Sequence, residues 1–131
     1  MIVLDTQAWL WWMHSPQTLS DAARTAVEEA EATSRILVSA ISVWEVAVKV
    51  ELGKLTLPMA IDDWYEKASS YPRIAVEPLS PRDAIASTQL PGTSHGDPAD
   101  RIIVAFALRH GAPLATSDRK IRDYAHVPTI W

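Results

Sequence analysis

Short apolar runs alternate with longer amphipathic segments along the chain. Runs of four to six residues without regular polar interruption predict strands buried on both faces, and they cover residues 1–4, 35–40, 74–79, 113–116 and 127–131. The segments between them predict helices over residues 6–13, 21–32, 42–52, 61–71, 80–90, 97–110 and 119–124. Strands that alternate with helices indicate an α/β protein, with a three-layer α/β/α arrangement and a mainly parallel central sheet. We expect a single domain over residues 1–131.

Several of these helices have recognisable start signals. Ser20 and Ser42 are the expected N-caps of the second and third helices, because a serine hydroxyl accepts a hydrogen bond from the first turn. Asp97 followed by Pro98 predicts another helix start, with proline at the first helical position. Residues 91–96, just before it, form a predicted turn.

Composition narrows the classes of function. Hydrophobic residues make up 48% and charged residues 21% of the chain, a globular balance. The absence of cysteine excludes disulfides and thiolate zinc sites, and it fits the cytoplasmic location that we expect. No apolar run approaches the ~18 residues that span a bilayer, so we expect no contact with a membrane. The net charge of −4 argues against a broad, sequence-independent grip on nucleic acid, but it permits an enzyme whose metal site is built from carboxylates.

Five acidic residues stand where a parallel sheet places its ligands. Asp5 directly follows the first predicted strand, and Asp118 lies two residues past the fourth. Asp97 and Asp100 begin a predicted helix, and Glu45 lies one turn into the helix after the second strand. Because ligands of open parallel sheets bind beyond the carboxyl ends of the strands, we expect these acids to meet at that edge.

Such a cluster favours phosphoryl chemistry with a divalent metal. Carboxylates a few ångström apart repel one another until protons or cations neutralise them. Mg²⁺ prefers oxygen ligands and keeps several of its waters, so two or three direct carboxylates are enough to hold it. A metal ion in that place activates water as a nucleophile and neutralises charge on the departing oxygen.

The same acids also have simpler explanations. Asp97 and Asp118 suit helix N-caps, and Asp100 suits a first helical turn, where the helix dipole favours an acid. Glu45 stands four residues before a lysine and suits a surface ion pair. Asp5 is the hardest to explain in this way, because an acid that closes a buried apolar strand requires a partner.

Four motifs together resemble those of PIN-domain proteins, and within that family the VapC-type toxins. They are IVLDT at residues 2–6, SAISVWE at 39–45, HGDPADRIIVA at 95–105 and LATSD at 114–118. They occur in the family's order over nearly the whole chain. The resemblance implies a nuclease that hydrolyses RNA phosphodiester bonds with Mg²⁺, for which Mn²⁺ can substitute.

The resemblance also implies roles for particular residues. The family's catalytic quartet of acids corresponds to Asp5, Glu45, Asp100 and Asp118. The expected metal ligands are Asp5, Asp100, Asp118 and Asp97, although Asp97 is an extra acid for which a ligand, a supporting group and a cap all stay open. Thr6 and Thr116 resemble supporting hydroxyl residues. Arg101 is a candidate phosphate contact, with a solvated helix residue as the simpler explanation.

Three partners follow from the resemblance: an RNA substrate, a second copy of the chain in a homodimer, and a cognate VapB-like antitoxin. The segments around Trp9 to Met13 and around Trp44 to Leu55 are rich in large apolar side chains, which suit either core packing or an exposed groove. A groove would receive an apolar helix or tail of the antitoxin. An antitoxin arginine would then pair with the acids and compete with the metal.

Other functions remain open from the sequence. A housekeeping PIN-type nuclease that acts on structured RNA or DNA has the same site, and a non-catalytic module of the same fold is disfavoured by the intact quartet. A phospho-acceptor receiver-like domain also clusters acids on a small α/β fold. It requires an aspartate at the end of a middle strand, whereas the predicted middle strands here end at Ala40 and Leu79.

Overall fold

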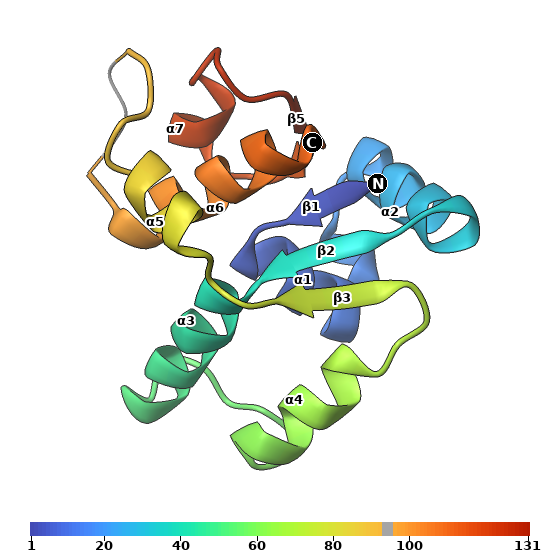
Figure 1. The fold of residues 1–131 in the computed structure, drawn as a ribbon. Coiled ribbons are helices and arrows are strands. Elements are labelled where there is room, and N and C mark those ends of the chain that lie inside the picture. The colour runs from blue at the N-terminus through green and yellow to red at the C-terminus, as the bar shows by residue number, and fades with distance from the viewer. Residues whose placement is uncertain (93–95) are drawn as a thin grey trace.

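Five parallel strands form one sheet at the centre of the molecule. The computed structural model describes residues 1–92 and 96–131, so the turn predicted over 91–96 lies partly outside the described residues. The strands have the order β3-β2-β1-β4-β5, and every neighbouring pair is parallel (Figure 1). Their bounds are Ile2–Leu4 for β1, Ile36–Ser39 for β2, Ile74–Glu77 for β3, Leu114–Ala115 for β4 and Thr129–Ile130 for β5.

Helices connect the strands, as the alternating pattern predicts. They are α1 (Thr6–His14), α2 (Asp21–Thr33), α3 (Ala40–Glu51), α4 (Ile61–Ser69), α5 (Pro81–Ala86), α6 (Pro98–His110) and α7 (Arg119–Arg122), with a short 3₁₀ turn η1 (Pro16–Thr18). All the predicted strands and helices occur, and the predicted mainly parallel sheet is confirmed. The last three elements, β4, α7 and β5, are shorter than predicted, because residues at the ends of the predicted ranges lie in loops.

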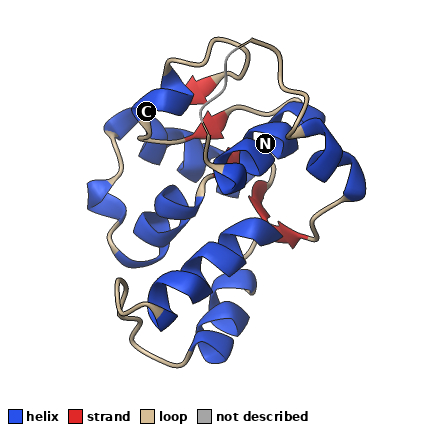
Figure 2. Ribbon diagram, turned by 90° about the vertical axis from the view of Figure 1, so that its left-hand side faces the viewer, coloured by secondary structure: helices blue, strands red, loops and turns tan. Residues whose placement is uncertain are grey.

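The sheet separates two apolar cores, because successive side chains of a strand point to opposite faces. The first core joins one face of β1 and β2 to α1, α2 and α4, through Ile2, Leu4, Ile36, Val38, Trp9, Val27 and Trp64. The second joins the opposite face to α6 and α7, through Val3, Leu37, Leu114, Ile103, Phe106 and Ile121. Figure 2 shows the strands enclosed by helices. The three-layer α/β/α fold is therefore confirmed.

The N-cap of helix α3 lies three residues earlier than the sequence predicts. The hydroxyl of Ser39, the last residue of β2, accepts a hydrogen bond from the Ile41 backbone N–H at 3.2 Å and caps the helix. The prediction that Ser42 is the cap was therefore wrong. Strand β2 passes into α3 without a loop, so Ser42 lies inside the helix, where its side chain is fully buried and faces Thr6.

The carboxyl ends of the strands lie at one edge of the sheet. In Figure 1 the arrowheads of β1, β2 and β3 point to the left, and Figure 2 is seen from that side. Asp5 directly follows β1 at this edge, and Thr116 directly follows β4. Within residues 1–92 and 96–131, no helix is long and apolar enough to cross a membrane.

Candidate active site

Asp5 is a buried acid that is held by hydrogen bonds on two sides. Its side chain is 7% exposed, and its Oδ1 accepts a hydrogen bond from the Ala8 backbone N–H at 2.8 Å, which caps α1. The Thr116 hydroxyl donates to the same carboxylate. Burial raises the pKa of Asp5 to about 6, although both hydrogen bonds act to lower it; the nearby charges of Glu45 and Asp118 raise it further. Asp5 therefore favours added positive charge.

Thr116 connects Asp5 to Asp118. The threonine is fully buried, and its Oγ1 accepts a hydrogen bond from the Asp118 backbone N–H at 3.1 Å. Asp118 in turn caps α7, because its Oδ1 accepts from the backbone N–H groups of Lys120 at 2.8 Å and Ile121 at 3.3 Å. A single buried hydroxyl thus contacts the Asp5 carboxylate and the Asp118 backbone, which fixes the spacing between the two residues.

Glu45 is bound by the second predicted hydroxyl residue, Thr6. The Thr6 Oγ1 lies 2.5 Å from Glu45 Oε1 and 2.9 Å from the hydroxyl of Ser42. Thr6 has one hydroxyl proton, so when it donates to Glu45 it accepts from Ser42. No ion pair joins Glu45 to Lys49 in the part of the chain that the structure describes. The simpler explanation of Glu45 as a surface pair therefore has no support.

Asp97 and Asp100 lie together at the start of α6. Asp97 caps the helix, because its Oδ1 accepts from the backbone N–H groups of Ala99 at 2.9 Å and Asp100 at 3.3 Å. Burial raises the pKa of Asp100 to about 7, and the charges of Asp97, Glu45, Asp118 and Asp5 raise it further, in that order. The charges of all the other predicted acids therefore act on the Asp100 carboxylate.

These mutual effects show which of the predicted acids lie together. Asp5, Glu45, Asp100 and Asp118 come from four different elements, and the charges of Glu45 and Asp118 act on both Asp5 and Asp100. Asp97 joins them through Asp100. Part of this region is an open hollow of about 570 Å³, lined by Gly96, Asp97, Asp100, Asp118, Arg119 and Lys120. Asp5 and Glu45 are not among its lining residues.

Three residues of this region were not predicted from the sequence. Ser42 supports Thr6, but a serine near a strand end suggests a cap first. Arg119 and Lys120 line the hollow beside the acids. The signal that could have found them is a basic run directly after Asp118 in a chain of net charge −4.

Arg101, the predicted phosphate contact, follows Asp100 on α6 and is only partly exposed. Its Nε atom is buried and has no hydrogen-bond partner among the residues that the structure describes. This environment differs from that of a fully solvated helix residue.

The chemistry of the site fits a hard divalent cation. The donors at this edge are carboxylate oxygens, which Mg²⁺ and similar ions prefer, and the raised pKa values of Asp5 and Asp100 indicate that the folded chain favours added positive charge. Within the described residues, no three His, Cys, Asp or Glu side chains already stand as a closed set of metal ligands. Mg²⁺ keeps several of its waters when it binds, so it does not require a closed set of carboxylate ligands.

Comparisons with known proteins agree with this geometry. Residues 2–127 match the family model of the PIN domain. The chain is 35% identical over 132 aligned residues to Ribonuclease VapC22 of Mycobacterium tuberculosis, an alignment that covers 99% of this chain and 98% of the relative. The family match leaves the receiver-like alternative without support.

Solved structures with low sequence identity have the same fold. VapBC2 from Rickettsia felis, bound to a DNA fragment from their promoter, contains a chain with a TM-score of 0.70 and 18% identity, and the match covers 98% of this chain and 97% of that one. A toxin–antitoxin complex from Klebsiella pneumoniae gives a TM-score of 0.67 and 20% identity, covering 100% of this chain and 97% of that one. By its family model and its relative, this chain belongs to the PIN-domain family and, within it, to the VapC-type proteins.

Proposed function

We propose that this chain is an Mg²⁺-dependent endoribonuclease, with Mn²⁺ as a substitute, and that it is the toxin of a toxin–antitoxin pair. The observation that carries the nuclease assignment is a cluster of acids in which burial and neighbouring carboxylates raise the pKa values of Asp5 and Asp100, in a chain 35% identical to a VapC ribonuclease. The toxin assignment is supported by relatives whose names include a VapC ribonuclease and a toxin–antitoxin complex.

The chain's own residues would act as follows. Asp5, Asp100 and Asp118 hold the metal, and Asp97 orients Asp100 from the helix cap; Glu45, fixed by Thr6, faces the attacking water. Thr116 keeps Asp5 charged and oriented by donating to it. Arg101 binds a phosphate oxygen of the RNA. When bound, Mg²⁺ supplies an activated water and neutralises charge on the leaving oxygen.

The nuclease proposal is tested with the purified chain and a labelled single-stranded RNA. We expect cleavage in Mg²⁺ or Mn²⁺ and none in excess chelator. Asp5→Asn and Asp100→Asn should each lose at least about 10²-fold in rate while keeping a native circular dichroism spectrum. Asp62→Asn, which changes an exposed acid in the first turn of α4, is the matched control and should keep full activity. Cleavage that persists in chelator, or in both site variants, would contradict the metal mechanism.

A groove between α1 and residues 54–58 supports the antitoxin as a partner. Its volume is about 340 Å³, and its apolar lining includes Leu10, Trp11, Leu55 and Leu57. Trp9 is fully buried and belongs to the core, so the apolar segment around Trp9 to Met13 contributes both to core packing and to the groove. Gln7 and Lys49 also line the groove, and they lie one residue after Thr6 and one helical turn after Glu45. An antitoxin segment in the groove would therefore end beside the acids, within reach of a basic side chain.

Co-expression distinguishes the toxin from a housekeeping nuclease. A toxin should purify as an inactive complex with the product of a neighbouring short gene, and it should regain cleavage after proteolysis of that partner. Trp11→Asp in the groove should weaken the complex, while Trp44→Asp, on the exposed outer face of α3, should not. If the chain alone is fully active in cells and harmless to them, the toxin assignment fails even where the nuclease assignment holds.

The proposal includes a homodimer and a cytoplasmic location, where the RNA substrate is found. Trp44 on α3 is 58% exposed and Leu52, the residue directly after this helix, is 62% exposed, and large apolar side chains so placed favour a protein contact. Light scattering should give twice the chain mass for the wild type and a lower mass for Trp44→Asp. A monomer for the wild-type chain at micromolar concentration would contradict the dimer.

A further inference from the structure

Helix α7 brings three cations to the rim of an acidic site. Its four residues are Arg119, Lys120, Ile121 and Arg122, and it begins directly after Asp118. Arg119 and Lys120 line the 570 Å³ hollow together with Asp97, Asp100 and Asp118, whereas Arg122 does not. Positive and negative side chains therefore share one open hollow.

The two cations are held in place by the backbone that carries them. Asp118 Oδ1 accepts hydrogen bonds from the backbone of Lys120 and Ile121, and the Asp118 carbonyl accepts one from the Arg122 N–H at 2.9 Å. Ile121 is 1% exposed and anchors the short helix in the second core. The residue that the proposed function assigns to the metal thus also sets the position of Arg119 and Lys120.

These cations are exposed and available to an anion from solution. Both are exposed residues, and no ion pair between described residues involves α7. Arg24, Arg35 and Arg109, by contrast, are paired with acids. Arg119 and Lys120 differ from the other basic residues without an ion pair because they line the acidic hollow.

RNA poses an electrostatic problem that these cations can solve. The chain has a net charge of −4, and its acids repel a polyanion. A metal ion at the acids compensates the phosphate that is cut, but the next phosphates along the strand would still face a negative protein. Fixed cations within the same hollow reduce that repulsion and also orient the strand across the site.

We propose that Arg119 and Lys120 bind two backbone phosphates of the RNA strand beside the phosphate that is cleaved. This inference rests on the proposed ribonuclease function and adds the surface that positions its substrate. Contacts with phosphates do not depend on the base, so α7 contributes affinity and register rather than sequence preference.

The test measures RNA binding separately from cleavage. In an Asp5→Asn background, the anisotropy of a fluorescent single-stranded oligoribonucleotide gives the binding constant between about 50 and 200 mM salt. Each phosphate contact with a single strand contributes about 0.7 to the slope of log K against log salt. Arg119→Ala/Lys120→Ala should therefore make this negative slope less steep by about 1.4, whereas Arg119→Lys/Lys120→Arg should leave it unchanged.

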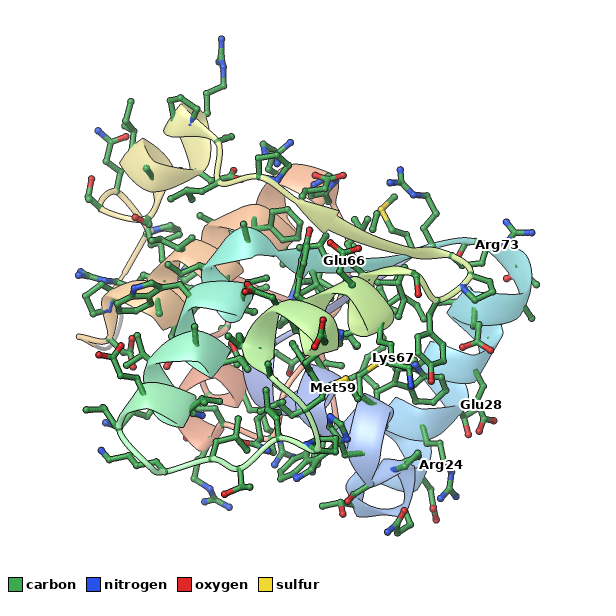
Figure 3. The ribbon with its side chains drawn as sticks, turned by 90° about the horizontal axis from the view of Figure 1, so that it is seen from below. Arg24, Glu28, Met59, Glu66, Lys67 and Arg73 are labelled. Carbon is green, nitrogen blue, oxygen red and sulfur yellow. The ribbon has the colours of Figure 1, made fainter. Side chains whose placement is uncertain are left out.

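Two controls remove the same kind of charge elsewhere. Arg122→Ala lies on the same helix but outside the hollow. Arg24→Ala/Lys67→Ala changes one arginine and one lysine on α2 and α4, which pack in the other core (Figure 3). Both should leave the slope within about 0.3 of the parent value, because neither touches a phosphate in this arrangement.

The outcomes separate this inference from the function on which it rests. An unchanged slope for Arg119→Ala/Lys120→Ala, or an equal fall in the controls, overturns the inference even if the wild-type chain cleaves RNA. A selective fall of about 1.4 with no RNA cleavage by the wild-type chain supports the phosphate site and contradicts the ribonuclease. If the phosphate site and the ribonuclease function are both correct, Arg119→Ala/Lys120→Ala should raise KM with little change in kcat, since the contact is present equally in the ground and transition states.

Discussion

Two groups of carboxylates that are wholly or partly buried in this fold have opposite surroundings. At the active-site edge, Asp5 and Asp100 have other acids as neighbours, and the pKa of each is raised. On α5, Asp83 is 2% exposed, but its Oδ1 accepts a hydrogen bond from Arg109 Nε at 2.7 Å. We call the second group the ion-pair cluster; it comprises Asp83, Arg109, Glu77, Arg35 and His110.

The ion-pair cluster joins elements that are distant in sequence. Glu77, at the end of β3, has Arg35 and Arg109 at 3.7 Å and His110 Nε2 at 3.0 Å. The hydrogen bond to Asp83 raises the pKa of Arg109, and the charges of Asp83 and Glu77 add to that effect. The cluster thus connects β3, α5 and α6.

The comparison indicates what each group contributes. Carboxylates with cationic partners stabilise the packing of α5 on α6, whereas carboxylates that face one another reduce the stability of the metal-free fold. Strained electrostatics of this kind are concentrated at functional sites, where a ligand relieves them. Removing a charge should therefore have opposite effects on stability in the two groups.

The largest expected stability effect is at the ion-pair cluster. Arg109→Ala removes the donor to a buried Asp83, and we expect a loss of about 3 kcal/mol in the free energy of unfolding by urea. Arg82→Ala, on the same helix as Asp83 but exposed, should change the free energy of unfolding by less than about 0.5 kcal/mol. Equal effects of the two variants would contradict the assignment of this cluster to stability. The folded Arg109→Ala protein should still cleave RNA.

The pH dependence of the metal-free protein should show the opposite sign from that of paired acids. Because Asp5 and Asp100 have folded-state pKa values of about 6 and 7, above the ordinary 3.8, the folded chain binds protons that the unfolded chain has released. Stability should then fall as pH rises from about 5 to 7.5, by about 2 kcal/mol after the half-buried Asp100 is discounted for solvent screening.

The double variant Asp5→Asn/Asp100→Asn is the control for this pH effect. It lacks both titrating groups, so its stability should vary much less over the same interval. Urea unfolding in chelator at several pH values measures both proteins. A wild-type stability that rises between pH 5 and 7.5 would show that the acids are not crowded.

Mg²⁺ should relieve the same repulsion. At a metal concentration about ten times the dissociation constant, binding to the folded chain adds about 1.4 kcal/mol to its stability. Calorimetry should show a higher Tm for the wild type and for Asp62→Asn, but a much smaller rise for Asp5→Asn. We expect Asp5→Asn without metal to be as stable as the wild type or more stable. An equal rise in Tm for all three proteins would place the metal elsewhere.

The elements and the acidic edge could be predicted from the sequence because both depend on local patterns. Runs such as Ile2-Val3-Leu4 before Asp5 report a buried strand and its end, and parallel strands bring those ends together. Asp97 before Pro98 likewise marks the N-cap and the first residue of α6. The order of the strands and the depth of each acid in the site depend on packing between distant elements.

The sequence does not predict which distant side chain a given polar group contacts in the fold. Ser42 suits an N-cap locally, but its place opposite Thr6 arises because β2 passes directly into α3, and α3 packs beside α1. Asp83 and Arg109 are 26 residues apart, so their pairing was equally invisible in local spacing. Arg119 and Lys120 of α7 can be read in the sequence, but only the fold shows that they line the acidic hollow.

The smallest effect that we predict concerns Thr6, which gives Glu45 a neutral partner, in contrast to the cations of the ion-pair cluster and the neighbouring acids of the active site. Its hydroxyl stabilises Glu45 without adding charge. Thr6→Val keeps the side-chain shape but removes the donor to Glu45 and the partner of Ser42, so we expect a stability loss of about 1 kcal/mol. Cleavage should fall by about tenfold, less than for Asp5→Asn, because Glu45 is still present but no longer held in one orientation. Thr6→Ser retains the hydroxyl and should recover most of the rate, measured as kcat under saturating RNA. If Thr6→Ser is as slow as Thr6→Val while both remain folded, the methyl group rather than the hydrogen bond positions Glu45, and the contact between α1 and α3 would act through packing alone.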